Sequence, residues 1–267
     1  MGQRGLLIVN ADDVGHDLDA TNGTLECFKV GRITSASAMV YMQASDRASG
    51  LLREVGIPVG LHINLSEAFS DPATPHEVMS CQAKLLRRFT PDHARRTLRW
   101  VYDPRIRRDV ERCVSDQLQR FEDLYGRPPT HVDGHQHVHV CPNVFLARSL
   151  PGGIRMRGTL ETYPLHRSAH ALARALRERV IKLRFPGTDY FFDISEVDPR
   201  RRFGLGRARL ALAAHSAVEV MAHPRFADER DCLMSSEWEE ALREHSLGSF
   251  ADLVTAHGRA PLAAQQS

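Results

Sequence analysis

Histidine and aspartate gather in one short segment of the chain. Residues 131–139 read HVDGHQHVH, which places four histidines and one aspartate within nine residues. Imidazole nitrogens and carboxylate oxygens bind zinc and other divalent metals, and imidazole also transfers protons near neutral pH. The segment therefore predicts a metal site with a substrate above it. The plainer alternative is a polar strand end in which the histidines are incidental.

The spacing of this segment limits how many side chains one ion can hold. On an extended strand the odd-numbered residues of 131–139 would share one face, with alternate residues about 6.6 Å apart. A metal that binds its ligands at about 2 Å cannot take them all, so we expect one or two histidine ligands. The spacing does not choose between His135 and His137. His131 is expected to be structural, and His139 to lie at the rim or in contact with substrate.

Two adjacent aspartates, Asp12 and Asp13, follow the apolar run GLLIVN at 5–10. Adjacent side chains on an extended segment point in opposite directions, so one carboxylate could bind a metal while the other takes a proton from bound water. The alternative is a capping or turn pair before a helix expected at 17–30. Two uncompensated carboxylates beside a buried strand would repel each other, which favours a nearby cation.

Single histidines lie at the ends of two further apolar runs. His62 is late in IPVGLHINL (57–65), and His223 follows AVEVMA and precedes Pro224. Taken alone, His62 is typical of a hydrogen-bonded core histidine, but its place at a strand end favours a functional role. His223 could protonate a leaving amine, because imidazole titrates near neutrality. The alternative for His223 is a simple turn residue.

The elements that must position these residues alternate between strand and helix. Strands are expected at 5–10, 34–41, 57–65, 129–135, 153–160 and 217–224. Helices are expected at 17–30, 44–56, 103–126 (with Asp103 as N-cap), 169–183, 205–214, 236–246 and 249–257, and a long loop at 66–80. This alternation predicts a parallel α/β sheet, either open or closed as a barrel. In both cases the carboxyl ends of the strands meet at one mouth, where distant residues converge.

Composition and charge exclude several classes of protein. A chain of 267 residues with 42% hydrophobic residues suits one globular domain, and a net charge of +2 indicates no polyanionic partner such as nucleic acid. The glycine-rich motifs of dinucleotide-binding and P-loop proteins are absent from the sequence. Five separated cysteines suit free thiols, and the N-terminal apolar run is too short for a signal peptide or membrane span. We therefore expect a cytoplasmic protein with no membrane partner.

Five segments occur in an order that resembles a known family. They are LLIVNADDVG (6–15), TSASAMV (34–40), VGLHINL (59–65), PTHVDGHQHVH (129–139) and VMAHP (220–224). Together they resemble the YdjC-like carbohydrate deacetylases, whose best-known member deacetylates chitooligosaccharides. The resemblance implies a single TIM-barrel-like (β/α) domain over 1–257, followed by a disordered tail at 258–267. It also implies that a divalent metal, with Mg or Zn favoured over Mn or Co, assists hydrolysis of the N-acetyl group of an amino sugar.

The resemblance assigns roles to individual residues. The implied metal ligands are Asp13, His62 and His135. Asp12 matches the general base, and His223 matches the histidine that assists the leaving amine.

The substrate side of the site is less closely matched. Arg155 lies where the family often has a substrate-side arginine, and we expect His137 and His139 to contact the substrate with it. Val14 stands where the family usually has phenylalanine, and Gly134 where it commonly has serine. The stretch 142–155 is shorter than the family's, while 66–80 and 184–206 match no motif and are expected to cover the mouth. An acetylated amino sugar is thus the expected small-molecule partner, and a homodimer is compatible with the sequence.

Two other classes stay open. Another barrel metallohydrolase, such as an amidohydrolase or phosphoesterase, typically has an H-x-H motif after the first strand, where this chain has ADD. A sugar- or metal-binding protein without catalysis needs no second carboxylate beside the ligand, so Asp12 distinguishes it in principle.

Overall fold

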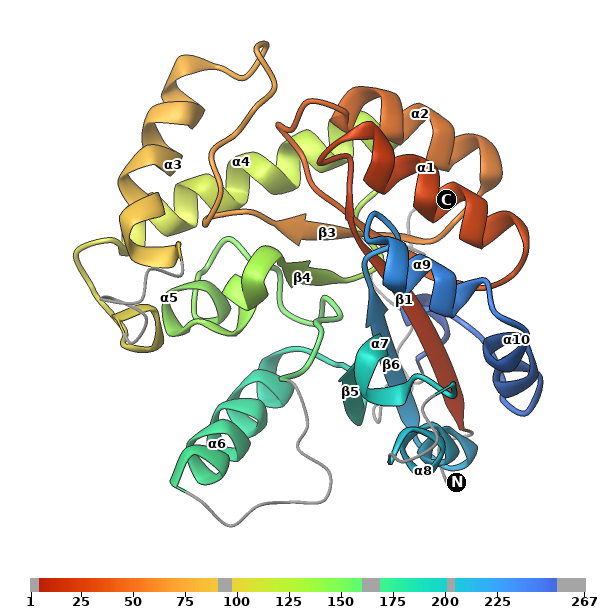
Figure 1. The fold of residues 1–267 in the computed structure, drawn as a ribbon. Coiled ribbons are helices and arrows are strands. Elements are labelled where there is room, and N and C mark those ends of the chain that lie inside the picture. Colours follow the sequence, from red (N-terminus) through yellow and green to blue (C-terminus); the bar gives the residue numbers. More distant parts are fainter. Residues whose placement is uncertain (1–4, 91–97, 160–168, 201–204, 254–267) are drawn as a thin grey trace, which may run out of the picture.

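Six parallel strands form one curled sheet (Figure 1). The computed structural model describes residues 5–90, 98–159, 169–200 and 205–253. The strands are β1 (Leu6–Val14), β2 (Ser35–Ala38), β3 (Val59–Ile63), β4 (Val132–Gly134), β5 (Tyr190–Asp193) and β6 (Ala217–Ala222). Their order across the sheet is β4-β3-β2-β1-β6-β5, and every neighbouring pair is parallel. The predicted α/β class is confirmed.

Helices connect the strands and cover the outside of the sheet. They are α1 (Leu18–Lys29), α2 (Ser45–Val55), α3 (His76–Phe89), α4 (Arg107–Tyr125), α5 (Pro142–Phe145), α6 (Ala169–Arg184), α7 (Ile194–Val197), α8 (Gly206–Ala211), α9 (Ala227–Leu233) and α10 (Ser236–Arg243). Helices α1, α2 and α4 pack beside one another over the half of the sheet that contains β1 and β3 (Figure 1). In the parts of the chain that the structure describes, no helix combines the length and apolar composition needed to cross a membrane.

The sheet is a curled half-barrel, and the prediction of a complete TIM barrel is not confirmed. Among the described residues, β4 and β5 are the edge strands of the sheet. Between them runs a short extended segment in which Met156 forms one parallel bridge to Val132. The backbone N–H of Met156 also donates to the carbonyl of Pro186 at 2.9 Å. The strand predicted at 153–160 is thus reduced to this single bridge.

The other predicted elements agree with the structure to different degrees. The strands predicted around β1, β2, β3, β4 and β6 are confirmed, whereas β5 was not predicted. The loop predicted for 66–80 ends early, because α3 begins at His76. Asp103 does not cap α4: the helix begins at Arg107, and the Asp103 carboxylate accepts from the backbone N–H of Arg105 at 3.0 Å. The predicted tail at 258–267 lies outside the described residues.

Strand β1 shows how the sheet separates an apolar face from a polar one. Leu7, Val9 and Ala11 are fully buried in the large apolar core that the helices share. Because successive side chains of a strand alternate between faces, Asn10 and Asp12 point to the interior of the curl instead. The polar residues in that interior carry the site.

Candidate active site

The end of β1 brings two adjacent carboxylates to the same histidine. Pairing between β1 and β2 changes register between Ala11 and Val14, and Asp13 has a left-handed backbone with φ of 62°. As a result, Asp12 Oδ2 lies 3.9 Å from His62 Nδ1, and Asp13 Oδ1 lies 3.3 Å from His62 Nε2. The prediction that the two aspartates point in opposite directions is therefore wrong. It assumed a regular strand, which the register change interrupts.

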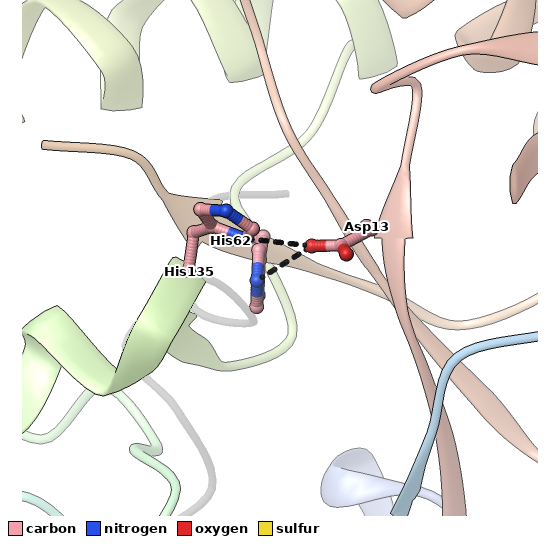
Figure 2. Close-up of side chains that lie close together, drawn as sticks. All are labelled: Asp13, His62 and His135. Carbon is pink, nitrogen blue, oxygen red and sulfur yellow. Dashed lines mark hydrogen bonds and ion pairs between the residues drawn. The ribbon is translucent and has the colours of Figure 1, made fainter. Parts of the chain in front are cut away.

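Asp13, His62 and His135 converge from three different strand ends, and we call them the ligand cluster (Figure 2). His62 comes from β3, and His135 follows β4 directly. His135 Nδ1 lies 2.9 Å from Asp13 Oδ1, and one nitrogen or oxygen atom from each of the three side chains lies within 4.8 Å of the others. Two imidazoles and one carboxylate form a donor set that suits a divalent metal. The three residues that the resemblance implies as metal ligands thus lie together in the structure.

His62 must lose a proton before it can bind a metal. Burial lowers the pKa of His62, but the charges of Asp133 and Asp12 oppose burial and raise the pKa to about 10. A metal that binds His62 must displace this proton, as metal binding at imidazole does in general.

A second group of possible ligands, formed by Asp12, His62 and Asp133, already holds a cation of the protein itself. Arg157 Nη1 lies 2.6 Å from Asp12 Oδ2, and Arg157 Nη2 lies 2.7 Å from Asp133 Oδ2. A metal at this position would meet the full charge of the guanidinium in a buried environment. The ligand cluster is therefore the better candidate for a metal.

The histidine-rich segment turns sharply after β4 instead of continuing as a strand. Residues His135–Val140 form a 3₁₀ helix in which Gln136 and His137 have positive φ values of 52° and 59°. The prediction that the odd-numbered residues share one strand face is wrong for this reason. Gly134 makes the turn possible, because a Cβ there would lie 2.8 Å from Val138 Cγ2. The glycine that departs from the family pattern thus has a local steric role.

The turn sends the remaining histidines to different places. His131 stacks on Phe250 with ring centroids 3.8 Å apart and contacts Ser37 Oγ at 2.9 Å, which confirms that it is structural. His139 is fully buried, and neither ring nitrogen has a hydrogen-bond partner among the described residues. His137 is partly buried, with its ring 6.0 Å from that of Phe191. Burial, followed by the charge of Arg157, lowers the pKa of His137 to about 4, so its ring is neutral at pH 7.

The predicted substrate contacts are not all brought to the ligand cluster. Arg155 Nη2 donates to the carbonyls of Ala251 and Leu253 at 3.2 and 3.4 Å, which directs its charge to the C-terminal segment. The buried ring of His139 cannot touch a substrate in this conformation. His137 and Arg155 are both partly exposed, but the guanidinium of Arg155 is turned to the C-terminal segment.

Arg157 organises the polar interior, and it was missed because the sequence favoured Arg155 in the same segment. The fully buried Arg157 guanidinium donates to Asp12 Oδ2 and Oδ1, both at 2.6 Å. It also pairs with Asp133 at 2.7 Å and with Glu219 Oε1 at 2.7 Å. The available signal was a glutamate in the middle of the buried strand AVEVMA, because a buried charge needs a partner.

Two of the carboxyl groups that contact Arg157, those of Asp133 and Glu219, have pKa values shifted in opposite directions. Burial raises the pKa of Asp133, but Arg157 and His62 oppose burial and hold this pKa well below its usual range. Burial raises the pKa of Glu219 to about 8, although Arg157 opposes the change. Asp133 is therefore the ionised partner that holds His62, with Oδ1 2.8 Å from His62 Nδ1.

His223 is a partly buried histidine that lies beside Glu229. Its Nδ1 lies 3.4 Å from Glu229 Oε1, and its backbone N–H donates to Glu229 Oε2 at 2.6 Å. Burial lowers the pKa of His223, but the Glu229 carboxylate and then the charges of Asp12 and Asp13 raise it to about 9. His223 is thus protonated at neutral pH. Glu229 was not predicted, although it lies only six residues further along the chain.

Sequence comparison finds relatives that match most of the chain. A chitooligosaccharide deacetylase of Enterobacter sp. (strain 638) is 31% identical over 276 residues, which cover 93% of this chain and 99% of the relative. A human carbohydrate deacetylase is 38% identical over 248 residues, covering 82% of this chain and 75% of that protein. A mouse carbohydrate deacetylase is 40% identical over 140 residues, covering 52% of this chain and 44% of the mouse protein.

A similar fold occurs in a crystal structure from Enterococcus faecalis V583, a protein whose assigned role in cellobiose-phosphate cleavage is provisional. The TM-score is 0.63 at 20% identity, with 92% of this chain and 98% of the other covered, which shows the fold alone. The sequence pattern that defines the YdjC-like proteins matches residues 6–253. The chain therefore belongs to the YdjC-like protein family.

Proposed function

We propose that this protein is a metal-dependent hydrolase that removes the N-acetyl group from an acetylated amino sugar, giving a free amine and acetate. The observation that carries the proposal is the ligand cluster, which lies at the strand ends beside a second carboxylate, Asp12. The relatives named as carbohydrate deacetylases support the choice of reaction and of substrate class. The substrate is a mono- or oligosaccharide or a glycosylated natural product.

The ligand cluster would hold one divalent ion, with Mg or Zn favoured and Mn or Co also chemically suitable. Three protein ligands leave coordination positions open for water and substrate. Its chemistry there would be that of a Lewis acid, which would polarise the acetamido carbonyl and lower the pKa of a bound water.

Asp12 would take a proton from the attacking water. Its Oδ1 accepts from Asn10 Nδ2 at 2.8 Å and from Arg157 Nη2, whereas Oδ2 accepts from Arg157 Nη1. Oδ2 therefore keeps a lone pair for the proton while the guanidinium fixes the plane of the carboxylate. This arrangement supports the role of Asp12 as general base.

His223 would protonate the departing amine. The charges of Asp12 and Asp13 contribute to its raised pKa, so the imidazolium lies within electrostatic range of the site. Glu229 Oε1 faces Nδ1, which leaves Nε2 as the nitrogen that can donate a proton to the substrate.

The five free, buried cysteines fit a reducing compartment such as the cytoplasm.

Acetate release from N-acetylglucosamine, its oligomers and a panel of glycosylated natural products tests the proposal. At least one substrate is expected to release acetate, and removal of the metal with a chelator should lower the rate by on the order of 10²-fold or more. Adding back Zn²⁺, Mg²⁺, Mn²⁺ or Co²⁺ should restore it. A protein that binds metal but releases no acetate from any of these sugars would instead be a binding protein or another kind of metallohydrolase.

The alkaline limb of the pH–rate profile tests the role of His223. Its pKa is raised to about 9, so the acid is present below that pH and kcat/KM is expected to fall as pH rises through it. Glu229→Gln removes the carboxylate that raises this pKa, so the limb should move to lower pH. A bound metal ion would shift the alkaline limb of wild type and of Glu229→Gln by the same amount, so the difference between them reports Glu229. Glu237→Gln, a change at an exposed glutamate, is the matched control. An alkaline limb unmoved by Glu229→Gln would exclude His223 as its source.

A further inference from the structure

Glu67 lies in the loop between β3 and α3 and reaches the ligand cluster from the solvent side. Its Oε2 is 3.2 Å from His135 Nε2, and its Oε1 is 2.8 Å from His16 Nε2. The backbone at Glu67 is fixed as well, because its N–H donates to Asn64 Oδ1 at 3.0 Å and its carbonyl accepts from Gln82 Nε2 at 2.8 Å. The carboxylate is therefore held against His135 by side-chain and backbone contacts together.

The two histidines of the ligand cluster have the same arrangement of partners. His62 turns Nδ1 to the carboxylate of Asp133 at 2.8 Å and Nε2 to Asp13 at 3.3 Å. His135 turns Nε2 to Glu67 and Nδ1 to Asp13 at 2.9 Å. Each imidazole thus has one nitrogen facing Asp13 and the other facing a carboxylate outside the cluster. Such a carboxylate fixes the tautomer of a metal-binding histidine and increases its basicity.

We propose that Glu67 is a positioning residue of the metal centre, which pairs with His135 Nε2 so that Nδ1 is the ligand atom. The proposal deepens the proposed function, because it rests on a metal at the ligand cluster, although it does not depend on which bond is hydrolysed. Glu67 is not itself a ligand, because it contacts the nitrogen of His135 that is turned away from Asp13. Asp133 has the same role for His62 from inside the sheet.

Metal affinity of the full-length protein tests this role without any substrate. Zn²⁺ and Co²⁺ are titrated in competition with a chelator into metal-stripped wild type, Glu67→Gln and Glu67→Ala. Glu67→Gln should weaken binding by about 10–100-fold, and Glu67→Ala by at least as much. The Tm of the stripped variants should stay close to that of wild type, because the Glu67 side chain is 40% exposed. The visible spectrum of bound Co²⁺, which reports the coordination number, should match that of wild type, because no ligand is lost.

Glu77→Gln is the matched control. Glu77 lies ten residues further along, its side chain is 80% exposed, and it pairs with Arg112 at 2.8 Å instead of with a residue of the cluster. Its replacement should leave the metal affinity unchanged.

Two results would overturn the proposal. One is a metal affinity of Glu67→Gln and Glu67→Ala equal to that of wild type. The other is a Glu67→Ala protein that loses metal as completely as His135→Ala with a changed Co²⁺ coordination number, which would make Glu67 a ligand. If the affinity falls as expected while no sugar releases acetate, the positioning role stands and the proposed deacetylase activity fails.

Discussion

Replacing Arg157 by methionine is expected to lower the free energy of unfolding by about 3–5 kcal/mol, because the change leaves buried carboxylates without their cation. Arg157 is fully buried, and its guanidinium lies within 2.7 Å of carboxylate oxygens of Asp12, Asp133 and Glu219. Methionine fills much of the same volume, so the loss reports charge compensation more than packing. Urea unfolding of metal-stripped protein measures it.

Arg105→Met is the control for that variant. The Arg105 side chain is 87% exposed and pairs with Asp103 at the surface, so its replacement should cost no more than about 1 kcal/mol. A loss for Arg157→Met as small as that of the control would mean that the carboxylates need no compensating cation.

Asp12→Asn is expected to lower kcat for acetate release by about 10²–10⁴-fold, the range that a general base contributes. An amide cannot accept the proton from the attacking water. The metal content should stay at the wild-type level, because Asp12 is outside the ligand cluster. Rates are expressed per metal-bound site, since the loss of charge opposite Arg157 also lowers stability. Acetate-release kinetics and metal analysis of the same samples measure both quantities.

Two further variants serve as controls for Asp12→Asn. Asp13→Asn should lose metal together with activity, whereas the exposed Asp19→Asn should lose neither. Full activity in Asp12→Asn would show that another group is the base.

Much of the sheet could be predicted because its strands are continuous apolar runs. β1, β3 and β6 stand out for this reason, and their order along the chain already indicates a parallel α/β sheet. β5 is only four residues long, so periodicity could not separate it from a loop. Closure into a complete barrel depends on how many strands pair across the edges of the sheet, which a local pattern does not encode.

The ligand cluster could be predicted because its three residues lie at strand ends and match the family pattern. The side chains that contact those residues could not be predicted, because each comes from a segment that is distant in the sequence. Arg157 meets Asp12 across 145 residues, and Glu67 is 68 residues before His135 in a stretch that matched no motif. The direction of Asp13 depended on a register change, which alternating apolar and polar residues do not show.

The left-handed backbone at Asp13 narrows the choice of amino acid at that position. Positive φ costs most side chains about 1–2 kcal/mol, and aspartate and asparagine are the ordinary exceptions besides glycine. Glutamate would keep the charge but lose the backbone preference, and its longer chain would move the oxygen away from both histidines. Asparagine would keep the backbone and give up the charge. Of the two acidic amino acids, only aspartate provides both the backbone preference and the position of the charge. Replacement of Asp13 by glutamate is therefore not conservative, although the same exchange is conservative at many other positions.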